Sequence, residues 1–130
     1  MTPPNESGAG RPKPPRKTGL SHFFAAASYS IGGFQRLLQE SAFRQELLAM
    51  PVMVLVYWAI GASITEFAVF AMLALLLIAT EALNTAIECI VDQLTNEWAQ
   101  FAKEAKDLGS LAVMCVLLSH GVLLLYVALT

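Results

Sequence analysis

The chain carries little charge and lacks the short motifs by which soluble enzymes hold nucleotides or metals. Only 14% of its 130 residues are charged and 56% are apolar, whereas soluble domains average about a quarter charged and about half apolar. Its two cysteines, Cys89 and Cys115, stand in apolar runs without metal-site spacing. Neither a glycine-rich phosphate loop nor a GxGxxG is present. The sequence therefore gives no indication of a soluble nucleotide-binding fold, and the composition favours a membrane protein.

Basic residues are scarce as well, and this argues against nucleic acid as a partner. Eight Lys and Arg against ten Asp and Glu leave a net charge of −2, too little basic character for a protein that binds nucleic acid. Residues 1–18 are basic and rich in Pro and Gly, without the apolar core of a signal peptide. We expect them to form a disordered cytoplasmic tail, so that the first membrane span serves as an uncleaved insertion signal.

Three segments are apolar enough to cross a membrane, at about 47–62, 66–92 and 108–129, since a spanning helix needs about 20 residues. The first two are joined by the short turn "GASITE", so they must run antiparallel. The polar link at 93–107 is expected to be part helix and part loop. Basic residues occur only in the tail, before the first span and in this link. The positive-inside rule then places the N-terminus in the cytoplasm and the C-terminus outside.

Residues 20–46 precede the first span and mix aromatic and aliphatic side chains with Arg, Gln and Glu at helical spacing. This pattern predicts an amphipathic helix on the cytoplasmic surface, with Gly32 and Gly33 breaking or bending it. The predicted fold is therefore an all-α membrane protein. A domain over 19–130 holds three transmembrane helices and the N-terminal surface helix.

The second span contains a polar stretch, "EALNTAIECIVD", in an otherwise apolar segment. At about 100° per residue its polar side chains share an arc of about 100°: Glu81, Asn84, Thr85, Glu88 and Asp92. The opposite face keeps Leu83, Ile87 and Ile90. At about 1.5 Å per residue, Glu81 lies about 10 Å deeper than Glu88. Because a carboxylate in lipid is costly, such a stripe should face the interior of a helix bundle.

The polar stripe of 81–92 could bring a water-soluble phosphate compound at the membrane surface into reach of a lipid hydroxyl in the membrane. Carboxylates near the cytoplasmic surface can hold Mg²⁺ that arrives with phosphates, and a deeper carboxylate can act as general base on a lipid hydroxyl. Lys106, which opens the third span, could pair with phosphate oxygens. Two alternatives use the same residues differently: a small proton or cation pathway, or acids that only fix helix packing in an oligomer. Crowding of the acids at one interface argues against the pathway.

Residues 81–92 resemble the signature E-x-L-N-[ST]-A-[IV]-E-x-x-V-D of the prokaryotic diacylglycerol kinase family. "ESAFRQE" (40–46) and "AKDLGSLAV" (105–113) resemble two further family motifs in order and spacing, and "YSIGGF" (29–34) is a weaker match. The resemblance covers about residues 19–130. It implies a multi-pass enzyme of the bacterial inner membrane, a homotrimer with sites shared between subunits. Such an enzyme transfers the γ-phosphoryl group of MgATP to the primary hydroxyl of diacylglycerol, giving phosphatidate in phospholipid metabolism.

The resemblance also implies residue roles on the cytoplasmic side. Glu81 would be the general base and Asn84 would orient the base or the substrate. Glu40 and Glu88 would hold Mg²⁺. The nucleotide would be bound by Tyr29, Glu40, Glu88, Glu97, Lys106 and Asp107. The lipid would be bordered by Ala42, Phe43, Arg44, Gln45, Glu46, Glu81 and Ser110. Asp92 is left with a structural role.

Some positions depart from the family pattern or fall outside it. Gln93 stands where relatives often have Arg, and His22 replaces an upstream basic residue. "KDLGSLAV" favours the diacylglycerol branch, because members of the undecaprenol branch tend to carry Ala-Ala-Gly after the same pair. An undecaprenol kinase is the alternative. His120 lies among Leu and Val, and we expect a neutral histidine whose hydrogen bonds are satisfied within the bundle.

Overall fold

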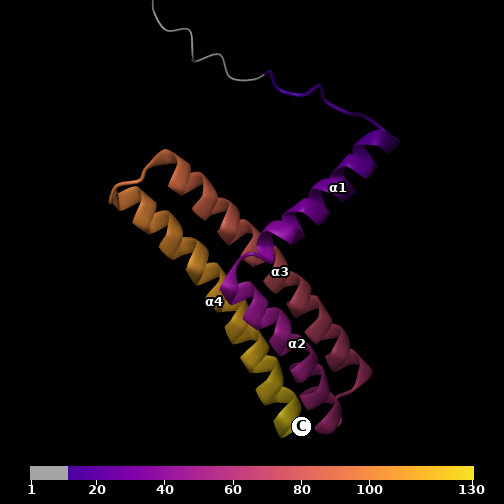
Figure 1. Cartoon of the computed structure of the whole chain (residues 1–130). Coiled ribbons are helices and arrows are strands. Elements are labelled where there is room, and N and C mark those ends of the chain that lie inside the picture. Colours follow the sequence, from indigo (N-terminus) through magenta and orange to yellow (C-terminus); the bar gives the residue numbers. More distant parts are fainter. Residues whose placement is uncertain (1–11) are drawn as a thin grey trace, which may run out of the picture. The chain divides into compact units, whose positions relative to one another are not determined.

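The computed structural model describes residues 12–130, and over that range the chain forms four α-helices and no strand (Figure 1). The helices are α1 (Leu20–Leu37), α2 (Ser41–Ala59), α3 (Ile64–Leu94) and α4 (Gln100–Leu129). The chain divides into two units, one up to Ile31 and one from Gly32 to Thr130. Of the predicted tail, residues 12–18 carry no helix or strand, and residues 1–11 lie outside the described residues.

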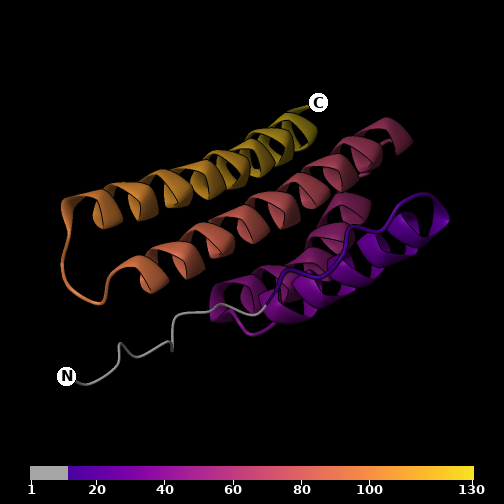
Figure 2. The same cartoon turned by 90° about the horizontal axis from the view of Figure 1, so that it is seen from above.

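The second unit is built on two long antiparallel helices, α3 and α4, which lie side by side in Figures 1 and 2. Two apolar clusters join the helices. One brings together Tyr57 of α2, Phe70 of α3 and Val127 of α4. The other joins Leu77 of α3 to Val113 and Val116 of α4. Because lipid is as apolar as these side chains, close packing rather than exclusion from water holds such helices together.

The turn between α2 and α3 is tight, as predicted. Gly61 takes a positive φ of 79°, a conformation that glycine adopts without steric cost. Ser63 then caps α3: its Oγ accepts from the Glu66 N–H at 3.3 Å, and the Glu66 carboxylate accepts from the Ser63 N–H at 2.6 Å. This reciprocal pair satisfies two backbone donors at the start of the helix and sets the antiparallel course of α2 and α3.

The sequence predicted one helix over 20–46, broken or bent at Gly32 and Gly33, and this predicted position of the break is wrong. α1 runs through Gly32 and Gly33 and ends at Leu37, and residues 41–46 begin α2. Arg44 stabilises this junction, because its Nη1 donates to the carbonyls of Leu38 and Gln39 at 3.0 and 2.9 Å. Carbonyls at a helix end need such partners, and a glycine inside a helix costs only about 1 kcal/mol.

Within residues 12–130, two helices, α3 and α4, are long and apolar enough to cross a membrane, with mean hydropathies of 2.0 and 2.3. The link predicted at 93–107 is a short connection after Leu94, followed by the first turns of α4 from Gln100. α2, which contains most of the span predicted at 47–62, is not among the helices that meet this criterion. The structure is thus consistent with an all-α membrane protein, and a third crossing stays a prediction.

Candidate active site

The polar side of α3 faces inward and lines a cavity of about 300 Å³. We call it the acidic cavity; its lining residues are Glu40, Ala42, Glu46, Glu81, Asn84, Thr85, Glu88, Ser110, Val113, Met114 and Leu117. Glu81 is 7% exposed, whereas Leu83 on the opposite face of α3 is 66% exposed. The predicted inward-facing stripe is therefore confirmed for its deeper part.

Glu81 meets a second acid at the deep part of this cavity. Glu46, on α2, lines the same cavity, and its carboxyl group is close enough to that of Glu81 for the two to interact. Oε2 of Glu46 is buried and has no hydrogen-bond partner among the described residues. Two carboxyl groups in this arrangement can pass a proton between them, which suits a general base acting on a hydroxyl group.

The side chain of Asn84 occupies space that a glycine of α4 leaves open. Its Nδ2 donates to Glu88 Oε1 at 3.3 Å, and its buried Oδ1 has no partner in the described part of the chain. A Cβ atom at position 109 would lie 2.2 Å from this Oδ1, so Gly109 is what lets the amide fit. Gly109 is absent from the predicted site residues. An isolated glycine inside an apolar helical stretch was the available signal of close approach.

Glu40 and Glu88, the predicted metal ligands, both line the acidic cavity. Within residues 12–130, no three or more His, Cys, Asp or Glu side chains form a ready-made metal site. Mg²⁺ is usually bound by one or two carboxylates together with substrate phosphates. The pair therefore fits a Mg²⁺ ion that arrives with a nucleotide.

Glu40 already has a cationic partner that the motifs did not reveal. Arg36 Nη1 donates to Glu40 Oε1 at 2.6 Å, and Arg36 Nη2 lies 3.7 Å from the sulfur of Cys89. Both ionic side chains are partly exposed, at 45% and 36%, so the pair is readily exchanged for other partners. Arg36 and Glu40 are four residues apart, a spacing that would have predicted this contact within a continuous helix.

Glu97 and Lys106 lie apart from the acidic cavity, in a second cavity of about 570 Å³ at the connection between α3 and α4. Asp92 also lines this link cavity, and it accepts a hydrogen bond from Lys106 Nζ at 2.7 Å. Lys106 does not line the acidic cavity, and its ion pair with Asp92 is partly exposed.

The other predicted nucleotide contacts lie elsewhere. Asp107 is exposed and pairs with Lys103 one turn earlier in α4. It lines neither the acidic cavity nor the link cavity. Tyr29 belongs to the first unit, where it lines a hollow together with His22.

The predicted lipid-bordering residues divide into two groups. Four of them line the acidic cavity: Ala42, Glu46, Glu81 and Ser110. The other three lie outside it. Phe43 is buried against Phe34, with ring centroids 5.8 Å apart, and Arg44 holds the carbonyls before α2. Gln45 is exposed. Phe43 and Arg44 thus stabilise the α1–α2 junction.

Fold and site together define a class: a helical protein of membrane character that gathers carboxyl groups between its helices. Comparison with known proteins agrees with this class. Residues 28–128 match the family model described as prokaryotic diacylglycerol kinase. The chain therefore belongs to the prokaryotic diacylglycerol kinase family, a family of lipid kinases, as its motifs predicted.

Individual relatives agree with this assignment. A diacylglycerol kinase of a Sinorhizobium species is 46% identical over 114 residues, which cover 88% of this chain and 83% of the relative. The diacylglycerol kinase of Pseudomonas aeruginosa is 38% identical over 97 residues, 74% of this chain and 79% of the relative. That of Escherichia coli K12 is 35% identical over 103 residues, 78% of this chain and 84% of the relative.

Proposed function

We propose that the protein transfers the γ-phosphoryl group of ATP to the primary hydroxyl of diacylglycerol, giving phosphatidate and ADP. The observation that supports this most is the burial of Glu81 beside Glu46 in a cavity that Glu40 and Glu88 also line. It offers a base for a lipid alcohol and, separately, carboxylates for a metal-bound nucleotide. The relatives described above are named diacylglycerol kinases, so we do not propose an undecaprenol kinase or an ion pathway.

Glu81 is the residue that we assign to the chemical step. Its carboxylate removes the proton of the lipid hydroxyl as that oxygen forms a bond to the γ-phosphorus. The bond between the γ-phosphorus and its bridging oxygen breaks at the same time, and ADP leaves with the electron pair. Asn84, held between Glu88 and Gly109, orients Glu81 or the hydroxyl. Positioning of this kind supplies most of the catalysis in phosphoryl transfer.

The nucleotide is bound by side chains that lie closer than Glu81 to the connection between α3 and α4. Glu40 and Glu88 would hold Mg²⁺, which when bound with ATP neutralises charge on the phosphate oxygens. Lys106 exchanges Asp92 for a phosphate oxygen. The resemblance adds Glu97, Asp107 and Tyr29 to the nucleotide contacts.

The membrane arrangement is part of the proposal. α2 makes the third crossing, at about 47–62, beside those of α3 and α4. Its Val52, Leu55 and Trp58 are 57%, 64% and 75% exposed in the single chain, and such side chains favour lipid or a neighbouring subunit over water. We place the domain of residues 19–130 in the inner membrane, with its amphipathic helix, N-terminus and site cytoplasmic and its C-terminus outside. The family resemblance favours a homotrimer with shared sites.

Product analysis tests this function. The purified protein, in detergent or a lipid mesophase, is offered diacylglycerol and undecaprenol side by side with radiolabelled ATP and Mg²⁺. We expect labelled phosphatidate, its loss when Mg²⁺ is chelated, and little labelled undecaprenyl phosphate. Release of inorganic phosphate without any labelled lipid would contradict the proposal.

A further inference from the structure

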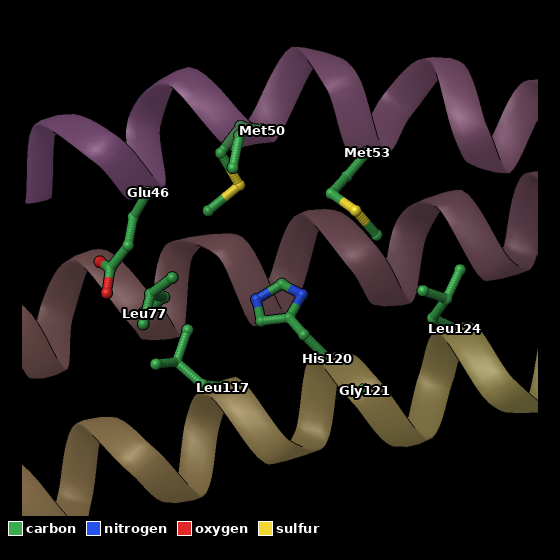
Figure 3. A pocket seen from close by; sticks show the side chains of 9 residues that line it. Glu46, Met50, Met53, Leu77, Leu117, His120, Gly121 and Leu124 are labelled. Carbon is green, nitrogen blue, oxygen red and sulfur yellow. The ribbon is translucent and has the colours of Figure 1, made fainter. Parts of the chain in front are cut away.

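A second hollow borders the acidic cavity, and Figure 3 shows the side chains that line this second hollow. The two share Glu46 and Leu117, and the second has a volume of about 230 Å³. We call it the apolar groove, because its lining is apolar apart from Glu46 at one end and His120 further along. Met50 and Met53 of α2 face His120 and Leu124 of α4 across it (Figure 3). An acyl chain entering beside Glu81 therefore has an apolar continuation.

His120 is the unexpected group in this groove. Its ring packs edge-on against Phe70, with centroids 5.5 Å apart, and its Nε2 is buried with no partner among residues 12–130. The expectation of a satisfied histidine is therefore wrong. The sequence neighbours of His120 are apolar or already bonded within α4, as the Ser119 hydroxyl is to the Cys115 carbonyl. Leaving a buried polar atom unpaired is unfavourable, so a small rotation of the ring that brings this nitrogen to the groove wall would let a ligand supply its partner.

The position of His120 along α4 indicates which atom of a ligand could reach its Nε2. His120 lies three residues beyond Leu117, about 4.5 Å further along the helix, and Leu117 borders both hollows. In a diacylglycerol, the reacting hydroxyl is separated from the ester carbonyls by a few bonds of about 1.5 Å each. Asn84 lies against Gly109, so Glu81 is level with about Ala112 of the antiparallel α4, and the backbone of His120 lies about 12 Å deeper. Side chains on a helix lean toward its N-terminus, so those of Glu81 and His120 lean toward each other. An ester carbonyl a few bonds from a hydroxyl at Glu81 therefore lies on the side of His120.

We infer that His120 recognises an ester carbonyl of the lipid substrate, which accepts a hydrogen bond from Nε2–H in the neutral tautomer protonated at that nitrogen. The acyl chains then follow the apolar groove toward Leu124. This inference rests on the proposed function, because it takes the hydroxyl to lie at Glu81. His120 is a specificity residue under this account. A polyprenol has no carbonyl, so it leaves the nitrogen unpaired and binds less well.

A pair of substrates tests the role of His120. Short-chain diacylglycerol is compared with the dialkylglycerol of equal chain length, whose ether linkages lack carbonyl oxygens. We expect the unaltered enzyme to favour the ester by about tenfold in kcat/KM, the size of effect of one hydrogen bond to an otherwise unpaired group. His120→Leu removes the donor and should bring the ratio close to one by slowing only the ester. His120→Gln keeps an N–H donor and should retain part of the preference.

Ser119→Ala is the matched control, because Ser119 is the exposed neighbour of His120 and lines neither hollow; it should keep the ester preference. An ester-to-ether ratio near one in the unaltered enzyme would overturn the inference, even if His120→Leu fails to fold. An equal preference in His120→Leu and the unaltered enzyme would overturn it as well, while leaving the kinase function intact. Failure to phosphorylate either lipid would overturn the proposed function, and the inference with it.

Discussion

The two halves of α3 place their polar groups in opposite ways. In the first half, Phe70 and Leu77 pack into apolar clusters, and the only acid, Glu66, is occupied in capping the helix. In the second half, Glu81 and Thr85 are buried and line a cavity. The first half of α3 thus serves packing, and the second half supplies polar side chains to a cavity.

Buried polar atoms without a hydrogen-bond partner also gather mainly at the cavities rather than in the apolar clusters. Four buried side-chain atoms lack a hydrogen-bond partner within the described residues: Glu46 Oε2, Tyr57 Oη, Asn84 Oδ1 and His120 Nε2. Tyr57 belongs to the apolar cluster. The other three line the acidic cavity or the apolar groove. Since each unpaired group costs about 1–3 kcal/mol, their gathering at two connected hollows indicates where a ligand supplies partners.

The largest expected effect compares one acid from each half of α3. Glu81→Gln should lower kcat by about 10²–10⁴-fold, the usual contribution of a general base. Glu66→Gln should leave kcat unchanged and cost only about 1 kcal/mol of stability through the weakened cap. The measurement is the rate of phosphatidate formation, with oligomer size checked by gel filtration. Near-normal kcat in a folded Glu81→Gln enzyme would place the base elsewhere.

A smaller effect is expected from crowding Asn84. Gly109→Ala places a methyl group 2.2 Å from the present position of Asn84 Oδ1, so the amide must move. We expect about a 10- to 100-fold loss of kcat, as for misplaced catalytic geometry. Gly32→Ala is the control, because a Cβ there meets nothing within 4 Å. Equal activity of the two variants would show that Asn84 has no positioning role.

Lys106→Met should act on the nucleotide rather than on the lipid. Losing one charge-assisted bond to phosphate, about 1.5–3 kcal/mol, should raise KM for ATP by roughly ten- to a hundredfold with little change in KM for diacylglycerol. Lys13→Met serves as the comparison, since Lys13 is exposed and lines neither the acidic cavity nor the link cavity. Initial rates over a range of ATP concentrations give the answer, and an unchanged KM for ATP would remove Lys106 from the site.

The smallest effect concerns the pair between Arg36 and Glu40. An exposed ion pair is worth about 0.2–1 kcal/mol, and here it competes with Mg²⁺ for Glu40. Arg36→Gln should therefore lower the Mg²⁺ concentration needed for half-maximal activity by up to about fivefold. A Mg²⁺ titration at saturating ATP measures this. A higher Mg²⁺ requirement would mean that Arg36 helps to bind the nucleotide instead.

Features that depend on a single helix or a single turn could be predicted from the sequence. The inward arc of Glu81, Asn84 and Glu88 follows from helical periodicity alone, and the tight turn follows from the few residues between two apolar segments. The missed features depend on how helices lie against each other. Contact between Gly109 and Asn84 requires the register of α4 on α3, and the unpaired nitrogen of His120 depends on what α2 and α3 place around it.

Photolabelling tests the central claim most directly, that the polar half of α3 lines the lipid kinase site. A short-chain diacylglycerol carries a diazirine next to its hydroxyl group, and labelled peptides are identified by mass spectrometry. The account predicts labels within residues 40–46 and 81–88 that disappear when excess unlabelled diacylglycerol is added. Competed labelling confined to the apolar half of α3, within residues 64–77, would contradict it.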